Sequence, residues 1–149
     1  MNVNECKEIE KKKAYLRRYK KNLAKIKRLE EKVEYINERM INLRAIRITD
    51  EPRGTTSISK AELLSDKIEY EERIERLKIK SRQLRKEIAE AIDTLEEVRH
   101  IDVLEAFFLD CLTFEEISEK LGYTLRHTIH LYSEGIKRTK ISLDSHFEN

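Results

Sequence analysis

Apolar residues recur every three or four positions along two long stretches of the chain. In the first stretch, one three-residue slip between Ile26 and Leu29 interrupts a heptad repeat of apolar positions: 16, 19, 23, 26, 29, 33, 36, 40 and 43. The second stretch runs from Leu63 to Val98 with alternating steps of four and three, and nine of its eleven seam positions are apolar. Such spacing is typical of a coiled-coil seam, and a three-residue slip overwinds the helix pair locally. The pattern predicts two long helices.

A polar segment at about 48–59 separates the two stretches. It contains the only proline, Pro52, and one of three glycines, Gly54. Because proline lacks a backbone donor and glycine tolerates positive φ, we expect no continuous helix through this segment. Ser59 and Glu62 have the spacing of a capping box that would open the second helix.

These elements predict an antiparallel coiled-coil hairpin over residues 5–98. A two-helix hairpin buries only one seam, so we expect it to need further cover from a second copy of the chain or from the C-terminal domain. Lys67 and Ser81 are the polar residues in the second seam. They either set the register of the two helices or lie where the seam is frayed.

A different pattern begins after Val98. Thr113 and Glu116 have capping-box spacing and would start a short helix. Gly122 follows where a helix end favours a left-handed residue, and Thr124 suits the N-cap of the next helix. Helix, turn and helix in this order predict a small helix-turn-helix domain over residues 99–143, followed by a tail at 144–149.

The second helix of this motif, at about 124–140, can bury either of two faces. In the first case Thr128 and Leu131 face the core and His127 lies on the flank. The side chains that then project outward are Thr124, Leu125, Arg126, Ile129, His130 and Ser133. A rival stripe would instead bury Leu125, Ile129, Tyr132 and Ile136. Arg126, His130 and Ser133 stay exposed in both cases.

An exposed helix of this kind fits the major groove of DNA. Arginine binds guanine edges through two hydrogen bonds, and basic residues further along the helix suit phosphates. Lys137, Arg138 and Lys140 would continue the same helix in that direction. The predicted DNA-binding residues are Thr124, Arg126, His127, His130, Ser133, Lys137 and Arg138.

Composition favours an all-α protein without enzymatic activity. Of 149 residues, 40% are charged and 7% aromatic, with three glycines and no tryptophan, which does not suit a many-stranded or conventional α/β core. The chain has no phosphate loop and no nucleophile elbow. We expect no cofactor and no metal, because His127 and His130 lack a suitably spaced third ligand, and we expect His100 and His146 to be exposed.

Charge is unevenly distributed. The first 47 residues carry 15 Lys or Arg against 7 Asp or Glu, whereas residues 101–149 carry 5 against 9. Ten basic and no acidic residues lie between 11 and 29. This run is either a solvated helix surface or a contact for phosphates or an acidic partner.

Cysteine use and hydropathy favour a cytoplasmic location. Cys6 and Cys111 lie far apart in no metal-like spacing, which suits a reduced, intracellular protein. No apolar run approaches the roughly 18 residues of a membrane-spanning helix, so we expect no membrane contact.

The stretch from Val103 to Arg138 resembles the helix-turn-helix of sigma-70 region 4. Its segments Leu-Thr-Phe-Glu-Glu-Ile, Leu-Gly-Tyr-Thr-x-Arg-His and Leu131-Tyr-Ser-Glu-Gly-Ile-Lys-Arg138 are similar to phage-encoded regulators of the ArpU/RinA type. Arg126 and His127 occupy the Arg-His positions of that family. The resemblance implies control of phage or prophage genes, with RNA polymerase as a further partner.

The sequence therefore favours a DNA-binding transcription regulator, in phage or prophage late-gene control, that binds double-stranded DNA. Homo-oligomerisation through the hairpin would supply a second DNA-binding helix. One alternative is a non-enzymatic adaptor that binds RNA polymerase or a sigma factor through the C-terminal domain. Another is the DNA-recognition subunit of a packaging machine, although such proteins usually carry the DNA-binding part first.

Overall fold

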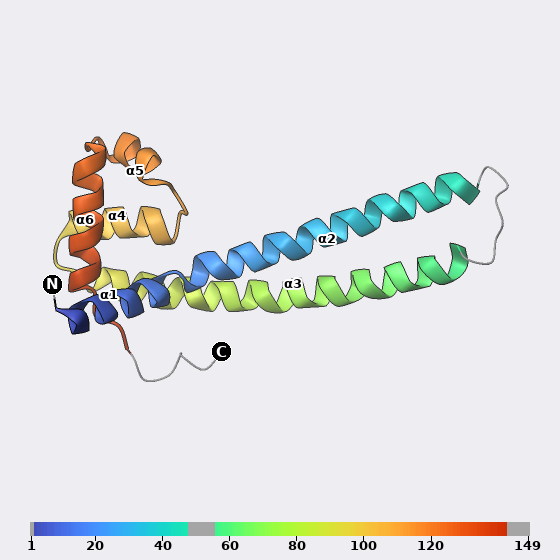
Figure 1. Ribbon diagram of the computed structural model, residues 1–149, viewed down its shortest axis with the longest axis horizontal. Coiled ribbons are helices and arrows are strands. Elements are labelled where there is room, and N and C mark those ends of the chain that lie inside the picture. Colours follow the sequence, from blue (N-terminus) through green and yellow to red (C-terminus); the bar gives the residue numbers. More distant parts are fainter. Residues whose placement is uncertain (1, 48–55, 143–149) are drawn as a thin grey trace. The chain divides into compact units, whose positions relative to one another are not determined.

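The computed structural model describes residues 2–47 and 56–142, and the side chains of 2–45 and 60–142. These residues form six helices without a strand among them (Figure 1), which confirms the predicted all-α fold. The helices are α1 (Val3–Leu16), α2 (Arg18–Arg47), α3 (Thr56–Asp93), α4 (Val98–Phe108), α5 (Phe114–Leu121) and α6 (Leu125–Arg138). Most of the predicted loop and the predicted tail lie outside the described residues. None of the described helices is long and apolar enough to span a membrane.

The chain divides into two compact units. One comprises Met1–Lys21 together with Arg82–Asn149, and the other is Asn22–Ser81. This division differs from the predicted boundary between residues 98 and 99. The reason is that α1 and the last turns of α3 share one buried core with α4, α5 and α6, a long-range packing that local periodicity does not report.

Within the Asn22–Ser81 unit, α2 and α3 run side by side in opposite directions (Figure 1). Ile26 and Leu29 of α2 pack with Ile74 of α3 in one buried cluster. Further along α2, the Lys32 Nζ lies 5.3 Å from the ring centroid of Tyr70, which is earlier in α3. The rising numbers on one helix meet falling numbers on the other, so the two helices of this unit run in opposite directions.

A buried polar contact fixes the register of this pair. The Asn22 Nδ2 donates to the Ser81 Oγ at 2.6 Å and to the carbonyl oxygen of Leu77 at 2.7 Å. Both Asn22 and Ser81 are buried, and a shift of either helix would leave their polar groups unpaired. Of the two interpretations of Ser81, the structure supports the register-setting one. Lys67 is half-buried, and its Nζ lies 3.9 Å from the Glu71 Oε1 on the same helix.

The predicted seams are buried along most of their length. Every α2 seam position from 19 to 43 is buried or half-buried, as are the α3 positions from 63 to 91. The seam was wrongly extended to Val98, because α3 ends at Asp93 and Val98, which starts α4, is 65% exposed. The capping box at Ser59 was also wrong. The helix already begins at Thr56, and several nearby hydroxyl residues are equally suited to cap it.

The core of the other unit forms where α4 packs against α6. A Cβ on Gly135 of α6 would lie only 3.1 Å from the Leu104 Cδ1 and 3.4 Å from the His100 Cβ. Glycine at this position thus permits the close approach of the two helices. His100 is only 3% exposed, which corrects the expectation that it is exposed. It lies one turn before Val103 and Leu104, on the face of α4 that packs inward.

Aromatic side chains fill the space between α4, α5 and α6. The Phe107 ring lies 4.9 Å from those of Phe108 and Phe114 and 4.8 Å from that of Tyr132, measured between centroids. Phe108 and Tyr132 are buried and the other two are half-buried. The three phenylalanines therefore belong to the core of this unit.

Four carboxylates gather where the end of α3 meets α4. Burial, followed by the charges of Asp93, Asp102 and Asp110, raises the pKa of Glu105 above its ordinary value. The folded state therefore binds the carboxyl proton of Glu105 more tightly than the unfolded state does. At a pH above the raised pKa, the ionised Glu105 lowers the stability of the fold. At a pH below the ordinary pKa of 4.5, Glu105 is mostly protonated in both states and this loss disappears.

We predict that Glu105→Gln raises the free energy of unfolding at pH 7 by a small amount, ~0.5 kcal/mol or less, because the carboxylate is partly solvated. The gain should shrink toward zero at pH 4, where the wild-type side chain is protonated in both states. Urea unfolding at the two pH values measures the difference. Glu90→Gln, an exposed carboxylate of α3, serves as the control. An equal gain at both pH values, or a loss at pH 7, would contradict this prediction.

Candidate nucleic-acid interface

Helix α5 begins with the predicted capping box. The Thr113 Oγ1 accepts a hydrogen bond from the Glu116 backbone nitrogen at 3.2 Å, and the Glu116 Oε1 accepts one from the Thr113 backbone nitrogen at 3.2 Å. Two backbone donors that the helix itself leaves unpaired are thus satisfied by side chains. The start of α5 is fixed locally by these residues.

A three-residue turn joins α5 to α6. Gly122 ends α5 with φ 74°, a left-handed conformation, and its nitrogen donates to the Ser118 carbonyl oxygen at 3.0 Å. Thr124 then caps α6, because its Oγ1 accepts a hydrogen bond from the His127 backbone nitrogen at 3.1 Å. The predicted order of helix, glycine turn and capped helix is confirmed.

One face of α6 is buried against its neighbours. The buried residues are Thr128, Leu131, Tyr132, Gly135 and Ile136. The Thr128 Oγ1 donates to the Thr124 carbonyl oxygen at 3.0 Å, which satisfies the one hydroxyl among them that is fully buried.

This burial decides between the two predicted faces of α6. Leu125 and Ile129 are 42% and 41% exposed, so the rival stripe that would bury them is wrong, although its other members Tyr132 and Ile136 are buried. At about 100° per residue, the buried arc is centred near Thr128 and Ile129 lies just beyond its edge, whereas Leu125, the first residue of the helix, lies on the same side as Tyr132 and Ile136.

Four of the predicted DNA-binding residues share the outward side at the start of α6. Thr124, Arg126, His130 and Ser133 are all exposed. No Asp or Glu occurs between Thr124 and Ser133. This outward side therefore offers hydrogen-bond donors and one permanent positive charge without a carboxylate on the same stretch.

His127 lies at the flank of that side, as predicted. It is half-buried, with its ring edge-on to Tyr123 at 5.2 Å and 6.4 Å from the ring of His130, measured between centroids. Within the described part of the chain, no three His, Cys, Asp or Glu side chains are grouped to hold a metal ion.

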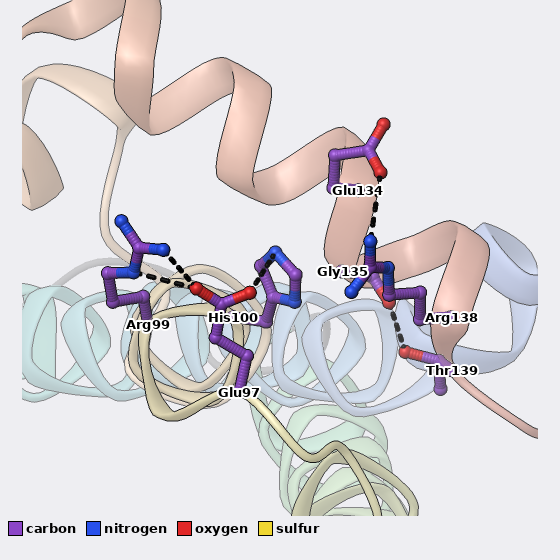
Figure 2. Close-up of polar contacts among 7 residues, drawn as sticks. All are labelled: Glu97, Arg99, His100, Glu134, Gly135, Arg138 and Thr139. Carbon is purple, nitrogen blue, oxygen red and sulfur yellow. Dashed lines mark hydrogen bonds and ion pairs between the residues drawn. The ribbon is translucent and has the colours of Figure 1, made fainter.

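The other two predicted DNA-binding residues, Lys137 and Arg138, are paired with Glu134 one turn earlier. The Glu134 carboxylate lies 3.5 Å from the Lys137 Nζ and 3.9 Å from the Arg138 Nη2, and Figure 2 shows the second pair. This pairing by Glu134 was not predicted, although the i, i+3 and i, i+4 spacing indicates it. Lys140 does not continue the helix, because α6 ends at Arg138 and Thr139 has an extended backbone.

A second carboxylate stands at the start of α4. Glu97 forms an ion pair with Arg99, and the Glu97 Oε2 lies 3.6 Å from the His100 Nε2 (Figure 2). The hydrogen bond from Arg99 lowers the pKa of Glu97, and the positive charge of Arg138 contributes to the same shift. The basic end of α6 therefore lies in a field of mixed sign, unlike its start.

The basic run at residues 11–29 divides into engaged and exposed side chains. The Lys12 Nζ donates to the Lys137 carbonyl oxygen at 2.8 Å, and the Arg18 Nη2 lies 3.1 Å from the Glu87 Oε2. The Lys20 Nζ lies 3.6 Å from the Phe107 ring centroid, and burial lowers its pKa. Exposed basic residues remain along the run: Lys11, Lys21, Lys25, Lys27 and Arg28. The engaged ones stabilise the fold, and the exposed ones leave both predicted interpretations open.

Comparison with known proteins gives no family for this chain, since no family model, curated protein or solved structure matches it.

Proposed function

We propose that the chain is a DNA-binding transcription regulator that places the start of α6 in the major groove. The observation that carries the proposal is the capped, carboxylate-free outward side formed by Thr124, Arg126, His130 and Ser133. It stands on a helix whose opposite side is buried and whose first turn is fixed by a cap. A helix held in this way can present side chains to base edges without rearranging first.

The dimensions suit this mode of binding. The ten residues from Thr124 to Ser133 extend over roughly 14 Å at about 1.5 Å per residue, comparable with the roughly 12 Å width of the major groove. Arg126 would contact guanine through two hydrogen bonds, and Lys137 and Arg138 would contact phosphates.

A single helix of this size contacts few base pairs, so the proposal includes a homo-oligomer. The Asn22–Ser81 unit supports it with large apolar side chains that neither helix of the pair covers: Tyr35, Ile41, Leu64, Ile68 and Ile79. A second copy of the chain would bury such residues and bring two DNA-binding helices to one DNA site.

The proposed setting is control of phage or prophage late genes, which rests on the likeness of the 103–138 stretch to ArpU/RinA-type regulators. An alternative function is a non-enzymatic adaptor for RNA polymerase or a sigma factor. Glu115, Glu116 and Glu119 favour it, because they are exposed on α5 and would repel phosphates rather than attract them.

We predict that Arg126→Ala weakens binding to a duplex selected from a random pool by about tenfold or more, the usual effect of losing a bidentate guanine contact. Fluorescence anisotropy between about 50 and 200 mM salt measures the affinity and its salt slope. Arg82→Ala removes the same charge from an exposed position on α3 and is the matched control.

Two outcomes would overturn the proposed function. Either no duplex is enriched from the pool by the full chain, or Arg126→Ala and Arg82→Ala weaken binding equally. Salt-insensitive capture of RNA polymerase or a sigma factor in the same experiments would support the adaptor instead.

We further predict that Glu134→Gln tightens DNA binding by about two- to fivefold. The substitution frees Lys137 and Arg138 from their intramolecular partner and removes a charge that phosphates repel, so the salt slope should also become steeper. Glu90→Gln on α3 removes an equal charge elsewhere and should have little effect. Unchanged affinity in Glu134→Gln would show that the end of α6 does not approach the DNA.

A further inference from the structure

Two aliphatic side chains border the outward side of α6, and the fold covers them only in part. Leu125 and Ile129 lie one helical turn apart and expose about two-fifths of their surface each. They belong to the same ten-residue stretch as Arg126 and His130, yet they can make no hydrogen bond to a base or a phosphate. None of the DNA contacts proposed above involves Leu125 or Ile129.

The major groove of DNA offers one apolar group on its base edges, the C5 methyl of thymine. The other three bases carry no methyl group there and present hydrogen-bond donors and acceptors. An aliphatic side chain would displace water from these groups without replacing the lost hydrogen bonds. If α6 enters the groove, Leu125 and Ile129 enter with it, and thymine methyl groups are the contacts that suit them.

We infer that Leu125 and Ile129 determine sequence specificity by contacting thymine methyl groups, beside the guanine contacted by Arg126. This inference rests on the proposed function. Four residues of helix span roughly 6 Å, and base pairs rise by about 3.4 Å, so the two contacts fall one or two base pairs apart. The DNA site should therefore contain two nearby thymines next to a guanine.

Charge favours DNA over a protein as the occupant of this surface. The apolar pair is followed along the helix by Arg126 and His130, and no carboxylate occurs from Thr124 to Ser133. The apolar side chains can face the bases on the floor of the groove. The neighbouring guanidinium is attracted to the negative charge of DNA, which a neutral or basic protein surface would not offer.

The test replaces thymines by deoxyuridine, one at a time, in a duplex selected with the full chain. Deoxyuridine keeps the hydrogen bonds of thymine and lacks only the methyl group. We expect affinity to fall about fourfold at each of two nearby positions in each half-site, the effect of withdrawing one buried methyl group, and to stay unchanged at the other positions.

Two protein variants assign the contacts. In Leu125→Ala, replacing one of the two thymines by deoxyuridine should no longer weaken binding, while the other replacement still weakens it about fourfold. In Ile129→Ala, the two thymines should exchange these behaviours. Val3→Ala is the control, because Val3 is 67% exposed on α1 and belongs neither to the α6 surface nor to the Asn22–Ser81 unit, and it should retain both effects. The uracil scan itself uses the wild-type chain, so it stays informative even if a variant fails to fold.

The outcomes separate this inference from the proposed function. Binding that depends on Arg126 but tolerates uracil at every thymine overturns the inference and leaves DNA binding in place. A chain that enriches no duplex overturns both. Loss of binding to RNA polymerase or a sigma factor in Leu125→Ala, without a uracil effect on DNA, would assign the apolar pair to a protein partner and overturn the inference.

Discussion

The packing of one face of α6 against its neighbours is the constraint on which the account of the site depends. Thr128, Leu131 and Ile136 are buried there, and Gly135 lets α4 approach within van der Waals contact. Because a helix repeats every 3.6 residues, a fixed inner face also fixes the outer one. The exposure of Arg126 and its neighbours thus follows from the core.

The two ends of α6 differ in how they are held. The first turn is fixed locally by the Thr124 cap, and no Asp or Glu occurs between Thr124 and Ser133. The last turn is tied into the unit, since Lys12 of α1 donates to the Lys137 carbonyl oxygen and Glu134 pairs with two cations. In the proposed complex, the start of α6 would contact bases. Lys137 and Arg138 at its end would contact phosphates after their ion pairs with Glu134 break.

Local signals in the sequence were sufficient for part of this structure. The Thr113 box, Gly122 and Thr124 each act through hydrogen bonds or backbone preferences within four residues, so their spacing predicted the turn between α5 and α6 correctly. The seam periodicity predicted the buried side of α2 and most of α3 for a similar reason, because one helix face is a local property.

Long-range packing accounts for what the sequence could not provide. Nothing near His100 indicates that Gly135, some 35 residues later, would leave room for α4 to bury it. The choice between Thr128 and Ile129 as the inner residue of α6 likewise depended on which surfaces α4 and α5 supplied. The membership of α1 in the unit with α4, α5 and α6 was missed because no proline or glycine marks the break at Arg17 between α1 and α2.

Backbone amide NMR of the full chain, titrated with a selected duplex, would show whether the start of α6 contacts DNA. We expect the largest chemical-shift changes on residues 124–133, with smaller changes at Lys137 and Arg138. Changes confined to the Asn22–Ser81 unit, or to α5 without α6, would contradict this expectation.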